Sequence, residues 1–258
     1  MKCVYASLFW LTVATQLSAE SAFVGPAGQR AAILLTYDDA IAASDLDVAI
    51  PQLNRAGLKG TFFLMGKAMH AADVSRWRTA AEAGHELGNH TVNHPCLRGT
   101  YPMPEQYNSE NYSVASLLTE VGVMNTLLTA IDGKAGHAFA TPCGHTKAGG
   151  QDYLAPLQAS GLVTYIRDRA ATAAGPGDPK VWQTAFEGAS GAEMIAWVRQ
   201  VQESRGLGVI VFHGVGGDYL AVTAEAHQAL LDYLAARRAE IWTVPVSVAM
   251  GYLAAHRR

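Results

Sequence analysis

Short runs of branched and aromatic residues alternate with helix-like segments along nearly the whole of the 258-residue chain. This alternation predicts parallel strands joined by crossover helices, because two parallel neighbours cannot be connected by a tight turn. The expected strands are short and lie at 32–36, 61–64, 86–88, 138–141, 162–166, 209–212 and 240–243. Such a set favours one α/β barrel domain, closed or incomplete.

Helices are predicted between several of these strands. The clearest signal follows Ser113, where apolar residues recur at spacings of four and three: Leu117, Val121, Met124, Leu128 and Ile131. Ser190 and Glu193 form a capping box at the start of a second helix, and a third is expected over 223–237. Pro51 requires the first helix to start late or to kink.

Residues 1–21 are predicted to be a secretory signal peptide, which leaves residues 22–258 as one domain. The segment has a lysine at its start, an apolar run too short to span a membrane, and small residues near its end. A buried first helix is the alternative. No later apolar stretch reaches the length of about 18 residues that marks a membrane span. We therefore expect a secreted or periplasmic mature chain without such a span.

The charge and cysteine content bear on the partners of the protein and on the state of its thiols. The chain has 19 Lys and Arg against 22 Asp and Glu and no long basic block, which argues against a nucleic-acid partner. Nothing in the sequence points to a particular protein partner. Removal of the leader leaves Cys96 and Cys143. In an oxidising compartment these two can form a disulfide, and free thiols or metal ligands are the alternatives.

Ionisable residues follow three of the predicted strands: Asp38 and Asp39, His90 and His94, and His213. The carboxyl ends of parallel barrel strands meet at one face, so these side chains are expected to lie together. Two histidines and one carboxylate form a metal site with positions left open for water. The second carboxylate can then serve as general base and His213 as general acid, which describes hydrolysis of an acyl bond. Taken singly, each motif has a structural alternative, such as a helix cap.

Four segments carry a wider pattern: Thr36-Tyr37-Asp38-Asp39, His90-Thr91-Val92-Asn93-His94, Ala140-Thr141-Pro142-Cys143-Gly144 and Ile210-Val211-Phe212-His213. In order and spacing they resemble motifs of the polysaccharide deacetylases, the NodB-homology group called carbohydrate esterase family 4. The resemblance extends from about residue 31 to residue 250. It implies a distorted (β/α)7 barrel of the NodB type, closed or incomplete.

The resemblance also implies roles for single residues. The metal ligands would be Asp39, His90 and His94. The ion would be Zn²⁺, with Co²⁺, Ni²⁺ and Mn²⁺ as alternatives. Asp38 would be the general base, His213 the general acid, and the backbone N–H of Cys143 an oxyanion donor. The candidate substrate contacts are Tyr37, Pro142, Gly144, Trp182 and Ile210, the last two around the acetyl methyl group.

The chain departs from the family pattern at three places. Ala140 stands where the family usually has an arginine that pairs with the base, and the candidate substitutes are His145, Arg167 and Arg169. The fourth family motif is not recognisable, so Asp168 is the candidate carboxylate that orients His213; a turn cap is its alternative. Ala40 follows the two aspartates where glycine is common.

The implied activity is metal-dependent removal of N-acetyl or O-acetyl groups from a carbohydrate polymer or oligomer. Two alternatives stay open: hydrolysis of another C–N bond on the same fold, and a catalytically silent carbohydrate-binding protein, which the missing arginine at Ala140 motivates. Residues 97–111 and 170–179 are expected to be long loops. The first of them, with the segment around Trp182, should decide which sugar is accepted.

Overall fold

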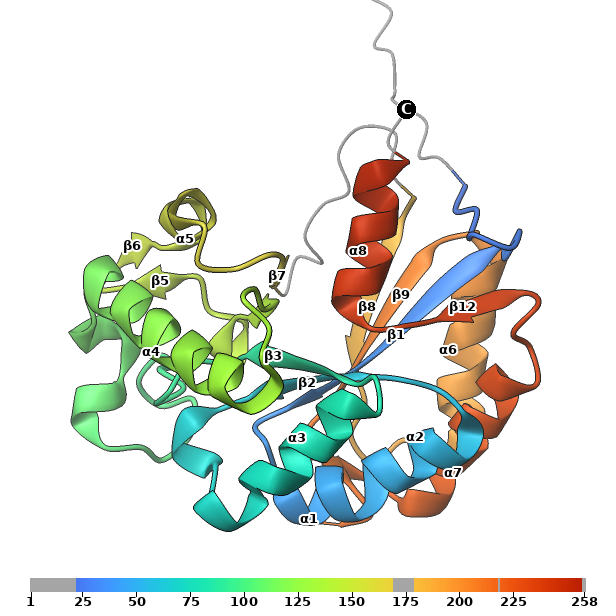
Figure 1. Ribbon diagram of the computed structural model, residues 1–258, viewed down its shortest axis with the longest axis horizontal. Helices are drawn as coiled ribbons and strands as arrows, with labels where there is room; N and C mark the ends of the chain where they lie inside the picture. Colours follow the sequence, from blue (N-terminus) through green and yellow to red (C-terminus); the bar gives the residue numbers. More distant parts are fainter. Residues whose placement is uncertain (1–21, 169–178, 218, 257–258) are drawn as a thin grey trace, which may run out of the picture.

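The computed structural model describes residues 22–168, 179–217 and 219–256. The predicted leader and almost all of the expected loop 170–179 therefore lie outside the described residues. The rest of the chain forms a curled, parallel half-barrel of strands with helices packed around it (Figure 1). This confirms the predicted barrel-type α/β fold, in its incomplete form.

The main sheet is parallel throughout, in the order β7-β4-β3-β2-β1-β9-β8, and β12 pairs with the start of β1. Its strands are β1 (Ala31–Asp38), β2 (Thr61–Leu64), β3 (Glu86–Asn89), β4 (Phe139–Ala140), β7 (Ile166–Arg167), β8 (Val181–Ala185), β9 (Leu207–Phe212) and β12 (Ile241–Thr243). Two small pairs lie apart from it: β5 (Lys147–Ala148) with β6 (Gln151–Asp152), and β10 (Gly214–Val215) with β11 (Ala221–Val222). Within the described residues, β7 and β8 are the two ends of the sheet.

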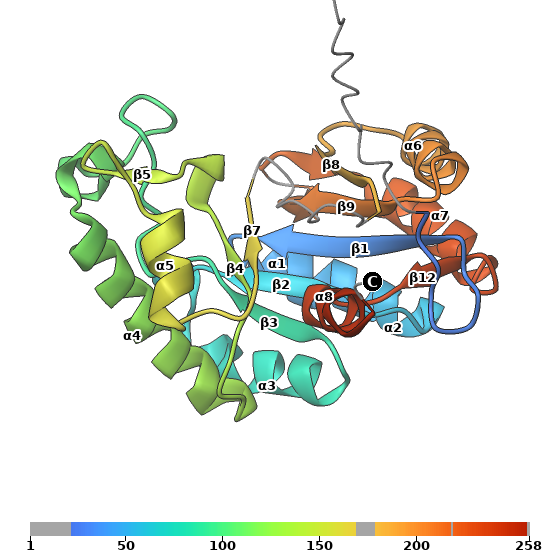
Figure 2. The same cartoon turned by 90° about the horizontal axis from the view of Figure 1, so that it is seen from above.

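The helices are α1 (Ala42–Ser44), a π-helical turn (Asp45–Ala49), α2 (Ile50–Ala56), α3 (Val74–Glu82), α4 (Val114–Asp132), α5 (Leu154–Ser160), α6 (Gly191–Glu203), α7 (Ala224–Ala235) and α8 (Val246–Ala255). Short 3-10 turns lie at Gly66–Ala68, Ala71–Asp73, Glu105–Tyr107, Ser109–Asn111 and Pro142–Gly144. Figure 2 shows α4 and α5 on the side of β4 and β7, and α6 and α7 on the side of β9. The predicted capping box at Ser190 forms, and Ser113 forms a second one with Ser116 at the start of α4.

Strand β1 runs through the centre of the hydrophobic core. All of its residues are buried, and successive side chains point to opposite faces of the sheet. Ile33 and Leu35 pack outward against the helices, in the cluster that includes residues of α2, α6 and α7. Leu34 points into the half-barrel, where Val246 of α8 belongs to the same buried cluster. Burial on both faces is what makes the strand apolar without alternation.

The structure corrects the expected elements at two places. Strand β8 is not among the strands expected from sequence, because Val181–Ala185 is a half-buried edge strand of mixed polarity. Of the strand expected at 162–166, only Ile166 pairs, together with Arg167. Pro51 lies in the first turn of α2, directly after the π-helical turn Asp45–Ala49, so the regular α-helix begins only one residue before the proline, in line with the expected late start.

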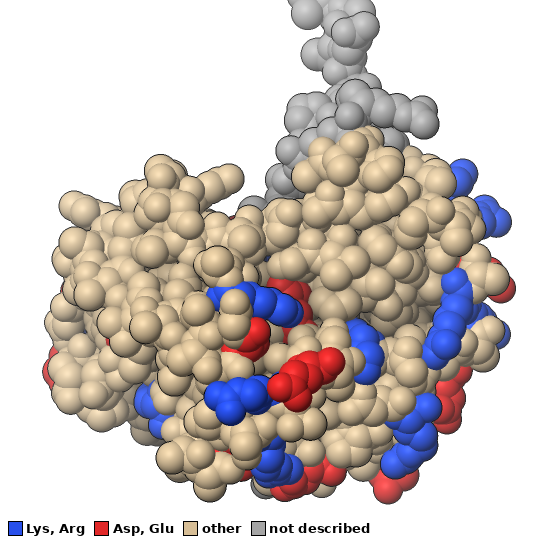
Figure 3. All heavy atoms as spheres, viewed as in Figure 1, with Lys and Arg blue, Asp and Glu red and all other residues tan. Residues whose placement is uncertain are grey.

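Helix α4 is, by length and composition, the single described helix that is apolar enough to cross a membrane. Its predicted stripe is nevertheless buried, and the helix packs against α3 and β3. On the outer side Val123 and Leu127 are exposed, and the surface over α4 and α5 carries few charged side chains (Figure 3). The buried stripe is the arrangement of a core helix in a globular domain.

Candidate active site and metal centre

The segments that follow β1, β3, β4, β7 and β9 surround one cavity of about 440 Å³. The convergence follows from the parallel sheet, whose carboxyl ends all face the same rim. The cavity lining includes all the residues expected to bind metal or take part in catalysis: Asp38, Asp39, His90, His94, Cys143, Asp168 and His213. Residues that are far apart in sequence are therefore brought together as predicted.

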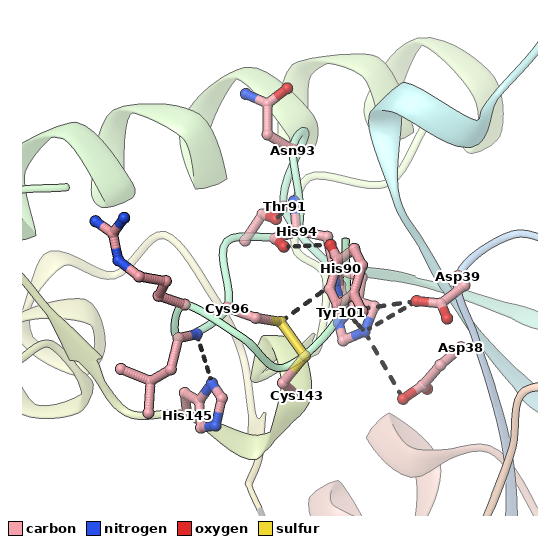
Figure 4. The surroundings of a disulfide bond; sticks show 12 residues. Asp38, Asp39, His90, Thr91, Asn93, His94, Cys96, Tyr101, Cys143 and His145 are labelled. Carbon is pink, nitrogen blue, oxygen red and sulfur yellow. Dashed lines mark hydrogen bonds and ion pairs between the residues drawn. A yellow bond between two sulfur atoms is a disulfide. The ribbon is translucent and has the colours of Figure 1, made fainter. Parts of the chain in front are cut away.

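Asp39, His90 and His94 turn three possible ligand atoms toward one point (Figure 4). The two Nε2 atoms are 3.0 Å apart, and Asp39 Oδ1 lies 3.6 Å from His90 Nε2 and 3.5 Å from His94 Nε2. Ligand atoms about 2.0–2.2 Å from a shared cation have this spacing. Asp39 Oδ1 is also buried and has no hydrogen-bond partner in the described part of the chain. These residues therefore fit a divalent cation.

Each of the two histidines is oriented through its Nδ1 atom. His90 Nδ1 lies 2.8 Å from the carbonyl oxygen of Ala140, so it carries the proton and leaves Nε2 as the free lone pair. His94 Nδ1 lies 3.2 Å from the hydroxyl oxygen of Tyr101, which itself donates to His94 O at 3.0 Å. Burial, and then the neighbouring His90, lower the pKa of His94 to about 2, so this ring is in the neutral form that a ligand requires.

The loop between the two histidines is folded by its own polar side chains. Asn89 Oδ1 accepts the N–H of Thr91 at 2.8 Å, and Thr91 Oγ1 accepts the N–H of His94 at 2.9 Å. Asn93 donates to Glu120 of α4. Thr91 and His94 have φ of 64° and 54°, a region that non-glycine residues rarely adopt. The local sequence thus dictates the turn that brings both rings to one side.

Asp38 is held by Arg167 on β7. Arg167 Nη2 donates to Asp38 Oδ2 at 2.5 Å, and Nη1 donates to Thr36 Oγ1 at 2.7 Å. Burial raises the pKa of Asp38, but the charges of Arg167, His90 and His213 outweigh it, and the net pKa is lowered. The carboxyl is therefore ionised, and Oδ1 has no hydrogen-bond partner among the described residues. That oxygen is available to accept a proton.

Arg167 thus takes the position that the sequence left open among three candidates. His145 is engaged elsewhere, where its Nδ1 accepts the N–H of Leu97 at 3.1 Å. Arg169 lies outside the described residues. Ala40 has a φ of 59°, a backbone conformation that glycine adopts more readily than alanine.

His213 follows β9 and lines the cavity, with the ring of Tyr219 edge-on at 6.3 Å. Asp168 lines the same cavity and is buried. Its Oδ1 has no hydrogen-bond partner among the described residues, and no hydrogen bond joins it to His213. The two residues share the site, and the orienting role of Asp168 stays a prediction.

Cys96 and Cys143 form a disulfide, with their Cα atoms 5.9 Å apart (Figure 4). Of the alternatives that the sequence left open, the structure has the disulfide. The bond joins the segment after His94 to the turn Pro142–Gly144 that follows β4. Cys143 has a φ of 53° and lines the cavity. The disulfide therefore links two segments that line the cavity, the one that carries His94 and the one that carries Cys143.

Four of the five expected substrate contacts do not line the cavity: Tyr37, Pro142, Trp182 and Ile210. Tyr37 is buried in the outer core, where its hydroxyl lies 2.8 Å from His227 Nε2. Ile210 is buried in the same core, and the next residue, Val211, lines the cavity instead. Strand alternation is the reason, because neighbouring side chains on a strand point to opposite faces.

Trp182 also points away from the site. Its ring packs against the outer core, and its Nε1 donates to Ser204 Oγ at 2.9 Å. The following residues of β8, from Gln183 to Ala185, line the cavity in its place. Pro142 is buried, whereas Gly144 does line the cavity as expected.

The cavity also includes residues that the sequence reasoning did not single out: Met65, Lys67, Thr100, Tyr101, Thr141, Thr184 and Tyr219. Tyr101 lies within the predicted loop 97–111, and an aromatic residue in such a loop is the feature of the sequence that could have marked it as a cavity residue. Lys67 Nζ donates to the carbonyl of Asn93 at 2.9 Å and to the hydroxyl of Tyr101 at 3.3 Å. The candidate specificity loop is therefore tied to the segment that carries the histidines.

The chain belongs to the polysaccharide deacetylase family, which it matches over residues 26–158, more than half of its length. A curated relative is the putative polysaccharide deacetylase YxkH of Bacillus subtilis strain 168. It is 31% identical over 77 residues, which are 29% of this chain and 27% of that protein. The match to this relative therefore covers well under two thirds of its length.

Solved structures share the fold. The Xyl-CE4 domain of a multidomain xylanase from the hindgut metagenome of Trinervitermes trinervoides has a TM-score of 0.57 at 16% identity, covering 88% of this chain and 92% of that one. A family 4 acetyl xylan esterase from Clostridium thermocellum, in complex with a cobalt ion, has a TM-score of 0.57 at 14% identity, covering 86% and 91%. At these identities the likeness establishes the fold.

Proposed function

We propose that this protein removes N-linked or O-linked acetyl groups from a carbohydrate polymer or oligomer by metal-dependent hydrolysis. The observation that carries the proposal is the convergence of Asp39, His90 and His94 on one point, beside an ionised Asp38. Zn²⁺ is the proposed ion, with Co²⁺, Ni²⁺ and Mn²⁺ as alternatives, because imidazole and carboxylate ligands suit all four. The cobalt ion in the acetyl xylan esterase complex is in keeping with such a site.

The roles of this chain's residues follow from where they lie. Bound at Asp39, His90 and His94, the cation would polarise the acetyl carbonyl and acidify the attacking water. Asp38 takes the proton of that water through Oδ1, which no other group occupies among the described residues. The backbone N–H of Cys143 donates to the oxyanion of the tetrahedral intermediate. His213 gives a proton to the leaving nitrogen or oxygen, so that acetate and a free amine or hydroxyl are formed.

Arg167 argues for catalysis over silent binding. The silent alternative was motivated by the alanine at position 140, where the family arginine is missing. Arg167 makes the corresponding contact with Asp38. The base therefore keeps the positive partner that orients it and holds it ionised.

We propose a secreted or periplasmic location. The predicted leader supports this location, and so does the disulfide, since disulfides persist in oxidising compartments.

Acetate release from chitooligosaccharides, peptidoglycan fragments and acetylated xylan tests the proposal. Each substrate is assayed with the untreated enzyme, after treatment with a chelator, and after return of Zn²⁺. We expect release from at least one substrate, loss with chelator and recovery with the ion. Release that survives complete removal of metal would overturn the metal dependence. Sugar binding without any acetate would favour the silent protein, and release of ammonia or an amine without acetate would favour a different C–N hydrolase.

A further inference from the structure

The disulfide connects two walls of the active site. Cys96 lies two residues after the candidate metal ligand His94, and its Sγ is 3.5 Å from His94 Nδ1. Cys143 is the residue whose N–H is proposed to hold the oxyanion. The bond thus fixes the distance between a metal ligand and an oxyanion donor that are 49 residues apart in sequence (143 − 94).

Both ends of this connection have an unfavourable backbone conformation. His94 and Cys143 have φ of 54° and 53°. Such conformations persist at non-glycine residues only where the surroundings hold them, and they concentrate at functional sites. Two hydrogen bonds also cross between the loops, from His90 Nδ1 to the carbonyl of Ala140 and from the N–H of Leu97 to His145 Nδ1. Neither of these bonds involves His94, which is held within its own loop by Thr91 and Tyr101.

We propose that the Cys96–Cys143 disulfide is a positioning element of the active site, beyond any contribution to stability. In the oxidised protein it fixes His94 against the Cys143 turn, so the cation is bound tightly and the oxyanion donor is in place. In the dithiol protein the cation is bound more weakly, and the oxyanion donor is no longer held in place. The effect on turnover rests on the proposed deacetylase function, whereas the effect on cation affinity does not.

The substrate loop does not depend on the disulfide to the same degree. The carbonyl of Cys96 accepts the N–H of Ser109 at 2.8 Å, which closes the base of the loop 97–108 through the backbone. A backbone bridge also pairs Cys96 with Asn108. Opening the disulfide leaves this closure intact. We therefore expect kcat and cation affinity to change more than KM.

The experiment compares two routes to the open state. One is the double variant Cys96→Ala/Cys143→Ala. The other is the wild-type protein treated with a water-soluble phosphine, which reduces the S–S bond to two thiols and is itself oxidised, with water, to the phosphine oxide. The readouts are the Zn²⁺ dissociation constant by chelator competition, and kcat and KM at saturating Zn²⁺. Leu234→Ala, in the buried face of α7, is the control for general destabilisation.

We expect both open forms to bind Zn²⁺ about 10–100-fold more weakly, the range found when groups that orient a ligand are removed. The value of kcat should fall at least about tenfold, and reoxidation of the reduced wild type should restore both quantities. Leu234→Ala should lower the melting temperature without changing the Zn²⁺ dissociation constant.

Unchanged Zn²⁺ affinity and unchanged kcat in the open forms would overturn the proposal and leave a purely stabilising bond. If the double variant does not fold, reduction and reoxidation of the wild type give the same decision. If no acetylated carbohydrate is turned over, the proposed function fails, yet the Zn²⁺ measurement still decides on the disulfide.

Discussion

Ala140 on β4 and Arg167 on β7 are register partners in the parallel sheet. Neighbouring strands are about 4.8 Å apart, so the arginine that holds Asp38 comes from one strand beyond the position where the family pattern places it. An arginine side chain is long enough to cover this difference. Asp38 therefore has an arginine partner in this chain, although Ala140 stands at the position where the family pattern would place one.

Because Ala140 and Arg167 are register partners, we predict that an arginine at position 140 can partly replace Arg167. Arg167→Gln should lower kcat by about 100-fold, because Asp38 loses its orienting partner, while the bound metal stays near one ion per chain. The double variant Arg167→Gln/Ala140→Arg should recover part of that loss. Steady-state kinetics and metal analysis measure both effects. Arg199→Gln on the surface of α6 is the control, and a near-normal kcat for Arg167→Gln would contradict the assignment.

Tyr101 should tune the metal site through His94. Tyr101→Phe removes the hydroxyl that lies 3.2 Å from His94 Nδ1. We expect the Zn²⁺ dissociation constant to rise about tenfold, with a smaller change of kcat at saturating Zn²⁺. Tyr107→Phe, in the same loop but outside the cavity lining, should leave the affinity unchanged. Equal affinities for the two variants would show that the Tyr101 hydroxyl has no such role.

His227 makes the stability of the protein depend on pH. Burial lowers the pKa of His227 to about 3, whereas an unfolded histidine titrates near 6.5. Between these values the unfolded state binds the extra proton, so stability is lost as the pH falls below about 6.5. At pH 5 the loss from this group is about 2 kcal/mol.

Urea unfolding at pH 7 and pH 5 measures this contribution. In His227→Gln the difference between the two free energies of unfolding should be smaller than in wild type by about 2 kcal/mol. His70→Gln, at an exposed position, should keep the wild-type difference. An unchanged difference in His227→Gln would mean that the buried ring is not the source.

The central residues of the site could be predicted because their chemistry is local in the sequence. Asp38 ends one strand and Asp39 follows it, and His90 and His94 follow another, so the parallel arrangement alone brings them to one rim. The turn between the histidines is also encoded locally, since Asn89 and Thr91 supply its hydrogen bonds.

The remaining features depend on relations that the sequence does not contain. The choice of Arg167 over two other candidates rests on the register of β4 against β7. Trp182 and Ile210 were expected at the substrate, but strand alternation turns Ile210 into the core and leaves Val211 at the cavity. The edge strand β8 has no apolar pattern to reveal it, so the cavity wall that it forms was missed.

The central claim is that Asp38 is the general base and Asp39 a metal ligand. Metal content and acetate release in the matched variants Asp38→Asn and Asp39→Asn test it most directly. We predict that Asp38→Asn retains about one Zn²⁺ per chain and loses at least about 100-fold in kcat, whereas Asp39→Asn loses the ion and the activity together. An Asp38→Asn protein that turns over at nearly the wild-type rate, or an Asp39→Asn protein that keeps its ion at full affinity, would contradict the account.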